Sequence, residues 1–128
     1  MNNKRLGTEF EREVVRLLSQ QGYWVHFITP SESGSQPFDI IASKDDTPVV
    51  IDCKTSSVKC FRFDRLEENQ ILAMDRWLEK GNKKARIYVK YNEKIYAIPY
   101  LMLKGLGKID LEKNDCFVVE RKDEDNRK

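Results

Sequence analysis

The feature that most constrains the fold is a predicted β-hairpin over residues 36–54. Two runs rich in β-branched and aromatic residues flank the polar segment 44–47, which reads Lys-Asp-Asp-Thr. Such runs on either side of short polar turn material are typical of two antiparallel strands. If these four residues are the loop, Ser43 lies opposite Pro48, and this pairing sets the register of the whole hairpin.

This register sorts the side chains of the hairpin into two faces, because strand residues alternate between faces. The predicted apolar face carries Phe38, Ile40, Ala42, Val49, Ile51 and Cys53. The other face gathers Asp39, Asp52 and Lys54 at the open end, with the two aspartates opposed. Opposed residues have Cβ atoms about 4.5–5.5 Å apart, so two carboxylates there share a proton or bind a cation.

An all-oxygen set at this end predicts a site for Mg²⁺ or Mn²⁺. The oxygens come from Asp39, Asp52 and the backbone carbonyl of Cys53, and hard divalent cations prefer such ligands. Lys54 lies two residues after Asp52 and therefore points to the same face, where it can meet a phosphate held on the metal.

The order Asp39, then Asp52-Cys53-Lys54, resembles the PD-(D/E)xK nuclease motif. Phe38 stands where the motif has proline, and Asp52 stands where glutamate is commoner. Upstream, the segment 7–13, Gly-Thr-Glu-Phe-Glu-Arg-Glu, resembles the GxxxE opening of archaeal Holliday junction resolvases and of their bacterial and phage relatives.

This resemblance implies that Glu11, four residues after the glycine, completes the metal site. The residues alone leave another interpretation open, since Glu9, Glu11 and Glu13 near a helix N-terminus complement the helix dipole without any further role.

Two amphipathic helices are predicted around the hairpin. Thr8 and Glu11 have capping-box spacing, and Gly22 ends the first helix. The second helix is predicted to be capped by Asp64, with Glu67 at the capping-box position, and to end at Gly81. Its buried stripe comprises Leu66, Gln70, Ala73, Met74 and Trp77.

Gln70 is out of place on this apolar stripe, because a buried amide costs stability unless it is hydrogen-bonded. The resemblance to the bacterial resolvases, which carry a His-Gln pair on the corresponding helix, implies that Gln70 lies beside the metal site and orients water or phosphate. The alternative is a glutamine at the edge of the stripe that reaches solvent.

Three further segments are candidate DNA contacts. Ser33 and Ser35 lie in a loop over residues 29–36 that resembles the small-residue segment before the first catalytic aspartate of the archaeal resolvases. Lys59 and Arg62 follow the hairpin, and Lys83 and Lys84 belong to the densest basic run. Hydroxyls and cations of this kind bind the DNA backbone. A surface loop explains the first segment equally well, and a basic run like the last is usually just a solvated helix end and loop.

The predicted fold is α/β: a restriction-endonuclease-like mixed sheet of about five strands flanked by helices, in the order α-β-β-β-α-β-β. Residues 1–122 are expected to form a single nuclease domain and 123–128 a charged C-terminal tail. A short helix over 100–106, ended by Gly107, is also expected. The resemblance covers about residues 4–100.

The composition limits the class of protein and its cellular location. Hydrophobic residues make up 40% and charged residues 34% of the 128 residues, which describes a soluble globular domain. No apolar run is long enough to cross a membrane. The three cysteines lack the spacing of a zinc site or a disulfide framework. We therefore expect the protein to work in a reducing cytoplasm and to be bacterial, archaeal or phage-encoded.

The predicted function is a Mg²⁺-dependent endonuclease that cleaves branched DNA and resembles Holliday junction resolvases. A homodimer is expected, because a resolvase cuts two strands placed symmetrically about a branch point. Apolar bulk in the strands over 87–100 and in the helix of Trp77 is the surface expected to form it. Two alternatives stay open: a nuclease of the same fold acting on other DNA in repair or restriction, and a non-catalytic DNA-binding module.

Overall fold

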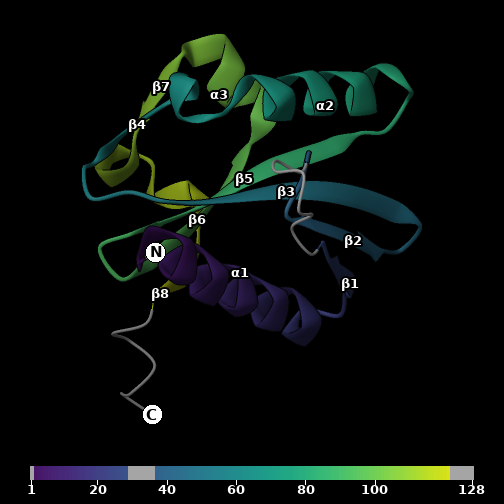
Figure 1. Cartoon of the computed structure of the whole chain (residues 1–128), viewed down its shortest axis with the longest axis horizontal. Helices are drawn as coiled ribbons and strands as arrows, with labels where there is room; N and C mark the ends of the chain where they lie inside the picture. The colour runs from purple at the N-terminus through teal and green to yellow at the C-terminus, as the bar shows by residue number, and fades with distance from the viewer. Residues whose placement is uncertain (1, 29–36, 122–128) are drawn as a thin grey trace.

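A mixed β-sheet forms the middle layer of the molecule, with helices on both of its faces (Figure 1). The computed structural model describes the backbone of residues 2–28 and 37–121 and the side chains of 9–28 and 37–120. One face is covered by helix α1 (Asn2–Gln20), and the other by α2 (Glu68–Glu79) and α3 (Tyr100–Leu106).

Within the described residues, the main sheet has six strands in the order β1-β2-β3-β5-β6-β8. Their bounds are Trp24–Phe27 for β1, Ile40–Lys44 for β2, Thr47–Thr55 for β3, Lys84–Tyr91 for β5, Lys94–Pro99 for β6 and Val118–Arg121 for β8. Of the strands that the structure describes, only β3 and β5 pair in parallel, and the connection between them carries α2. A second, two-stranded sheet pairs β4 (Cys60–Arg62) with β7 (Lys108–Asp110).

The predicted hairpin is present in the predicted register. Ser43 pairs with Pro48 in β2 and β3, and pairing continues one step further to Lys44 and Thr47. The connection is therefore a two-residue turn rather than the expected four-residue loop. Asp45 and Asp46 form it with φ angles of 53° and 64°, a left-handed conformation that two-residue hairpin turns require and that aspartate tolerates.

The hairpin buries both of its faces. Ile40, Ala42, Val49 and Ile51 pack against α1, as the alternation predicts. The opposite face is not a polar face, because Val50 belongs to the core beneath α2 and α3 and Ile41 packs against that core. Asp52 therefore lies on a face that it shares with the apolar side chains of Val50 and Ile41.

Phe38 lies on the other side of the sheet from its predicted position. It packs against the core beneath α2, and its ring meets Trp77 edge-on, with centroids 6.2 Å apart. Strand alternation does not extend to this residue because β2 begins only at Ile40.

Both predicted helix starts are wrong, whereas both glycine stops are confirmed. Helix α1 begins at Asn2, so Thr8 lies inside the helix and does not cap it. The glycine within this helix costs only about 1 kcal/mol, which the buried stripe of α1 outweighs. Gly22 and Gly81 follow α1 and α2 with φ angles of 94° and 98°.

Helix α2 is capped by Glu67, not by Asp64. The Glu67 side chain accepts a hydrogen bond from the backbone of Gln70, and the Gln70 side chain accepts one from the backbone N–H of Glu67. Asp64 lies in the preceding 3-10 turn, Phe63–Arg65. The capping box is therefore formed by the pair three residues further along the chain than predicted.

The second half of the chain follows the prediction up to α3 and then adds elements. Strands β5 and β6 form the expected hairpin through Asn92 and Glu93, and Gly107 ends α3. Strands β4, β7 and β8 were not predicted, because segments of three or four residues carry no clear periodic signal. The predicted fold class, a mixed sheet flanked by helices, is confirmed.

The aromatic strands do not leave apolar bulk for a partner, contrary to expectation. Tyr88, Tyr96 and Tyr100 are at most 2% exposed and belong to the cores on the two faces of the sheet. Large hydrophobic side chains that are exposed on α2 and α3 are Leu72, Leu101, Met102 and Leu106.

Candidate active site

Strand β3 carries Asp52 and Lys54 on the face toward α2. Asp52 is fully buried, and its Oδ1 accepts a hydrogen bond of 2.9 Å from Nε2 of Gln70. Lys54 Nζ lies 3.4 Å from Asp52 Oδ2 and 3.3 Å from Gln70 Oε1. Oδ2 accepts no well-formed hydrogen bond from any of the residues that the structure describes. One oxygen of a buried carboxylate is thus held by the protein, and the other faces only an ion-pair contact.

Asp39 is fixed beside this pair by the start of β2. Its Oδ2 accepts a hydrogen bond of 2.8 Å from the backbone N–H of Cys53, and its own N–H donates to the carbonyl of Ile51 at 3.0 Å. Its carbonyl accepts from the N–H of Ile28 at 2.9 Å. Backbone contacts to β3 and to the end of the β1 segment therefore set its position.

Like charges gather at this point, and the pKa values reflect it. Burial, followed by the charge of Asp39, raises the pKa of Asp52 well above its usual range, although Lys54 opposes the shift. Burial, followed by the charge of Asp39 and a hydrogen bond with it, raises the pKa of Glu11 to about 7. Carboxylates that crowd one another in a low-dielectric environment hold their protons in this way.

The structure therefore brings together five of the predicted site residues from four separate elements. Helix α1 supplies Glu11, the residue before β2 supplies Asp39, β3 supplies Asp52 and Lys54, and α2 supplies Gln70. The capping-box prediction for Glu11 is wrong, and the residue instead lies beside Asp39.

The donor set fits a hard divalent cation, although it is not preformed. Within residues 9–28 and 37–120, no three acidic, cysteine or histidine side chains are arranged to hold a metal ion as they stand. The carboxylates of Glu11, Asp39 and Asp52 nevertheless offer only oxygen, and Asp52 Oδ2 is a buried acceptor that makes an ion-pair contact with Lys54 but no hydrogen bond with the described residues. A cation would offset the burial and the repulsion that raise the pKa values of Glu11 and Asp52.

Cys53 lies between Asp52 and Lys54 on β3, and its thiol stays protonated. Burial, followed by the charges of Asp39, Asp52 and Glu11, raises the pKa of the Cys53 thiol. A neutral thiol is a poor ligand for Mg²⁺. The predicted use of its backbone carbonyl as a ligand stays a prediction.

The candidate DNA contacts fall into separate places. Lys59 and Arg62 are exposed and lie just beyond the end of β3 that carries Lys54, and Arg62 pairs with Asp64 at 3.3 Å. Ser33 and Ser35 lie outside the residues that the structure describes.

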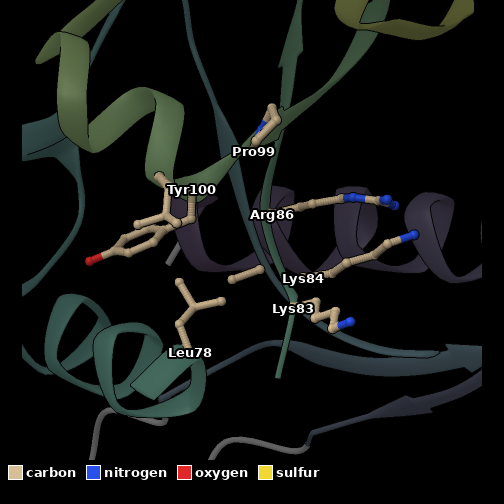
Figure 2. Close-up of a pocket in the computed structure, with 8 residues that line it drawn as sticks. Leu78, Lys83, Lys84, Arg86, Pro99 and Tyr100 are labelled. Carbon is tan, nitrogen blue, oxygen red and sulfur yellow. The ribbon is translucent and has the colours of Figure 1, made fainter. Parts of the chain in front are cut away.

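Lys83 and Lys84 lie toward the other end of β3. Lys84 pairs with Val49 in the parallel ladder, three residues or about 10 Å before Asp52 along the strand. The two lysines border a cavity of about 210 Å³ with Leu78, Pro99 and Tyr100 among its other lining residues. In Figure 2 the basic side chains extend away from the Tyr100 ring. Charge at this position can meet a DNA backbone only where the duplex extends past the site.

An ion pair that no sequence pattern predicts holds the helix of Glu11 in place. Lys90 Nζ lies 2.9 Å and 3.2 Å from the two carboxylate oxygens of Glu13, which joins α1 to β5. These residues are 77 positions apart, so no local pattern in the sequence marks the pair.

The fold and the site together define a nuclease of the PD-(D/E)xK type: two residues in D-x-K spacing on one strand, an aspartate beside them at the start of the neighbouring strand and a glutamate from the first helix. The model of the family described as "Archaeal holliday junction resolvase (hjc)" matches residues 2–126. The chain belongs to this family, and the match shows that the resemblance extends beyond residue 100 into the C-terminal segment.

Two individual comparisons agree with this assignment. The crossover junction endodeoxyribonuclease Hjc of Methanocaldococcus jannaschii is 29% identical over 99 residues, which cover 77% of this chain and 69% of that protein. The structure of Archaeoglobus fulgidus Hjc, a Holliday junction resolvase, superposes with a TM-score of 0.63 at 22% identity and covers 81% of this chain and 86% of that one. The second similarity supports the fold. No helix within residues 2–28 and 37–121 is long and apolar enough to cross a membrane.

Proposed function

We propose that this chain is a Mg²⁺-dependent endonuclease that cleaves branched DNA, with the Holliday junction as its substrate. The observation that carries the proposal is the buried Asp52, with one oxygen free of hydrogen bonds, beside Asp39, Glu11 and Lys54. This cluster occurs in a chain that belongs to a family of junction resolvases.

The acidic residues would hold the metal. Glu11, Asp39, Asp52 and the backbone carbonyl of Cys53 provide oxygen ligands for one or two ions, and Mn²⁺ is expected to substitute for Mg²⁺. When bound, the metal activates water and stabilises charge on the scissile phosphate.

Lys54 would act on the phosphate itself. Its ammonium is half-buried and lies 3.4 Å from Asp52 Oδ2, so it is held where a phosphate bound next to the carboxylates would arrive. A cation preorganised in this way stabilises the negative charge that develops in the transition state.

The DNA would be recognised through its backbone and its shape. Lys59 and Arg62 extend the positive end of the site beyond Lys54, and Lys83 and Lys84 provide a second basic point along the sheet. Ser33 and Ser35, which precede Asp39 in the sequence, stay candidate phosphate contacts. Backbone contacts of this kind carry most of the affinity and fall with salt.

A homodimer acting in the cytoplasm completes the proposal. One small domain with one site cannot cut two strands together, whereas a two-fold dimer matches the symmetry of a four-way junction. The exposed apolar side chains on α2 and α3 are the surface that supports such an assembly.

The proposal is tested by cleavage of a synthetic four-way junction and of a linear duplex of equal length, each with Mg²⁺, Mn²⁺ or EDTA. We expect symmetric cleavage of the junction with either metal and none with EDTA. Equal cleavage of both substrates would indicate a nuclease acting on other DNA, and binding without cleavage under every metal condition would indicate a non-catalytic module. Sedimentation at concentrations well above those used for binding tests the dimer.

A further inference from the structure

Gln70 uses both ends of its side-chain amide inside the protein. It is 8% exposed and lies in the first turn of α2. Its Nε2 donates to Asp52 Oδ1 at 2.9 Å. Its Oε1 accepts from the backbone N–H of Glu67 at 2.9 Å and from Lys54 Nζ at 3.3 Å. One side chain thus connects the start of a helix with two residues of the candidate site.

The orientation of this amide is fixed by its partners. The backbone N–H of Glu67 and the ammonium of Lys54 are donors only, so both require the amide oxygen. The amide nitrogen must then face Asp52, which accepts. No rotation by 180° preserves these contacts, because it would place the NH₂ group against two donors.

Occupation of Oε1 also limits what Gln70 can do for a substrate. The oxygen has two lone pairs, and Glu67 and Lys54 take both. The role implied by family resemblance, orienting water or phosphate, does not account for these contacts. A role in holding neighbouring side chains explains all of them.

We propose that Gln70 is a positioning residue, which ties Asp52 and Lys54 to the first turn of α2 and turns Asp52 so that its Oδ2 stays free of hydrogen bonds. The inference rests on the proposed function for its catalytic consequence. Partners that orient a metal ligand are typically worth about 10–100-fold in metal affinity or activity.

The competing explanation is that Gln70 only caps α2. Glu67 provides the matched control, because its side chain completes the same capping box from the other side. Glu67→Ala weakens the helix start and leaves the side-chain contacts of Gln70 with Asp52 and Lys54 in place. Gln70→Met keeps the length of the side chain but removes every hydrogen bond.

Gln70→Glu isolates the contact with Asp52. A glutamate at this capping-box position still accepts from the backbone N–H of Glu67, and its carboxylate still accepts from Lys54. It cannot donate to Asp52. Protection of the amides at the start of α2 in hydrogen exchange reports whether the cap has survived.

The experiment measures three quantities for each variant: the metal-free melting temperature, the Mn²⁺ dissociation constant from calorimetry, and the single-turnover cleavage rate on a four-way junction. For Gln70→Met and Gln70→Glu we expect roughly tenfold or greater losses in Mn²⁺ affinity or cleavage rate. For Glu67→Ala we expect a lower melting temperature, with Mn²⁺ affinity and cleavage rate within about twofold of the wild type.

Each outcome decides the matter. Wild-type Mn²⁺ affinity and cleavage in Gln70→Glu would overturn the proposal, as would losses in Glu67→Ala that equal those in Gln70→Met. If the wild type binds Mn²⁺ but cleaves no junction, the proposed function fails, and a Gln70-specific loss of Mn²⁺ affinity still supports the positioning role.

Discussion

Helix α2 contributes side chains to two clusters around carboxylates, and the two clusters have opposite electrostatic character. Near its start, Gln70 meets Asp52 in a group that also contains Asp39 and Glu11. One turn further on, Asp75 accepts hydrogen bonds from Tyr100 Oη at 2.8 Å and from Lys104 Nζ at 3.0 Å. The first cluster brings like charges together, and the second surrounds one carboxylate with donors.

The pKa values of the two clusters move in opposite directions. Burial raises the pKa of Asp52 and of Glu11, and Asp39 adds to both shifts. Burial also tends to raise the pKa of Asp75, but hydrogen bonds from Lys104 and Tyr100 outweigh it and lower that pKa. A lowered pKa marks a carboxylate that the fold stabilises, whereas raised values mark a cost that a bound cation would remove. The contrast distinguishes the carboxylate of Asp75, which its neighbours stabilise, from the candidate active site.

Asp52→Asn should show the largest effect. We expect cleavage to fall by more than the roughly 100-fold that loss of a supporting contact causes, because a proposed metal ligand is lost. The metal-free melting temperature should equal or exceed that of the wild type, since asparagine still accepts from Gln70 and repulsion is relieved. Thermal melts with and without Mg²⁺ test both points. A marked loss of thermal stability in the metal-free protein, with cleavage retained, would show that the Asp39–Asp52 pair is structural.

Lys54→Ala should abolish cleavage and preserve DNA binding. The ammonium is proposed to act on the phosphate, so its loss removes at most one phosphate contact, a change of about one in the slope of log affinity against log salt. Gel-shift titrations at two salt concentrations, combined with single-turnover cleavage, measure these quantities. Near-normal cleavage by this variant would remove Lys54 from the mechanism.

The metal-free protein should lose stability as pH rises from about 4.5 to 8. Glu11 has its folded pKa raised from 4.5 to about 7, so the folded state binds more protons than the unfolded state in this window. A full shift would correspond to about 1.4 kcal/mol per pKa unit, but Glu11 is only half-buried, so solvent screening reduces its contribution to about 1–2 kcal/mol. Asp52 acts in the same direction. Urea titrations across this range should show the decline, with Mg²⁺ flattening it. A rise in stability instead would remove the contrast between the clusters.

Asp75→Asn should behave in the opposite way, with lost stability and intact cleavage. The carboxylate holds α2 to α3 through Tyr100 and Lys104, and disrupting such partly buried contacts costs about 1–3 kcal/mol. Because the pKa of Asp75 is lowered from 3.8, its contribution is present above pH 3.8 and is lost as pH falls through the lower folded value. Urea unfolding at neutral pH measures the cost. A large loss of cleavage in a folded variant would place Asp75 in the functional cluster.

The sequence predicts one of these clusters far better than the other. The register of the hairpin follows from alternating residues and a short polar turn, and it alone places Asp39 beside Asp52 and Lys54. Gln70 is marked as a polar residue on an apolar stripe. Asp75, Tyr100 and Lys104 carry no such mark, because they meet only when α3 packs beside α2, at separations of 25 and 29 residues.

The wrong predictions for the α2 cap, Phe38 and the short strands also arise from contacts that local sequence patterns do not show. Glu67 caps α2 because Gln70 can reach back to its N–H, and Phe38 turns toward Trp77 because it precedes the strand. Strands β4 and β7 exist only as a pair between distant segments. Local patterns determine strands with a clear period, whereas long-range packing determines caps, short strands and side-chain networks.

The most direct test of the metal site counts the protons that leave the protein when Mg²⁺ or Mn²⁺ binds. At pH 6.5 the raised pKa values of Glu11 and Asp52 keep protons on the carboxylate cluster, and a cation must displace them. Calorimetric titrations in buffers of different ionisation enthalpy should show release of about one proton or more, reduced in Asp52→Asn and unchanged in Asp75→Asn. Metal binding with no proton release, or with the same release in Asp52→Asn as in the wild type, would contradict the account.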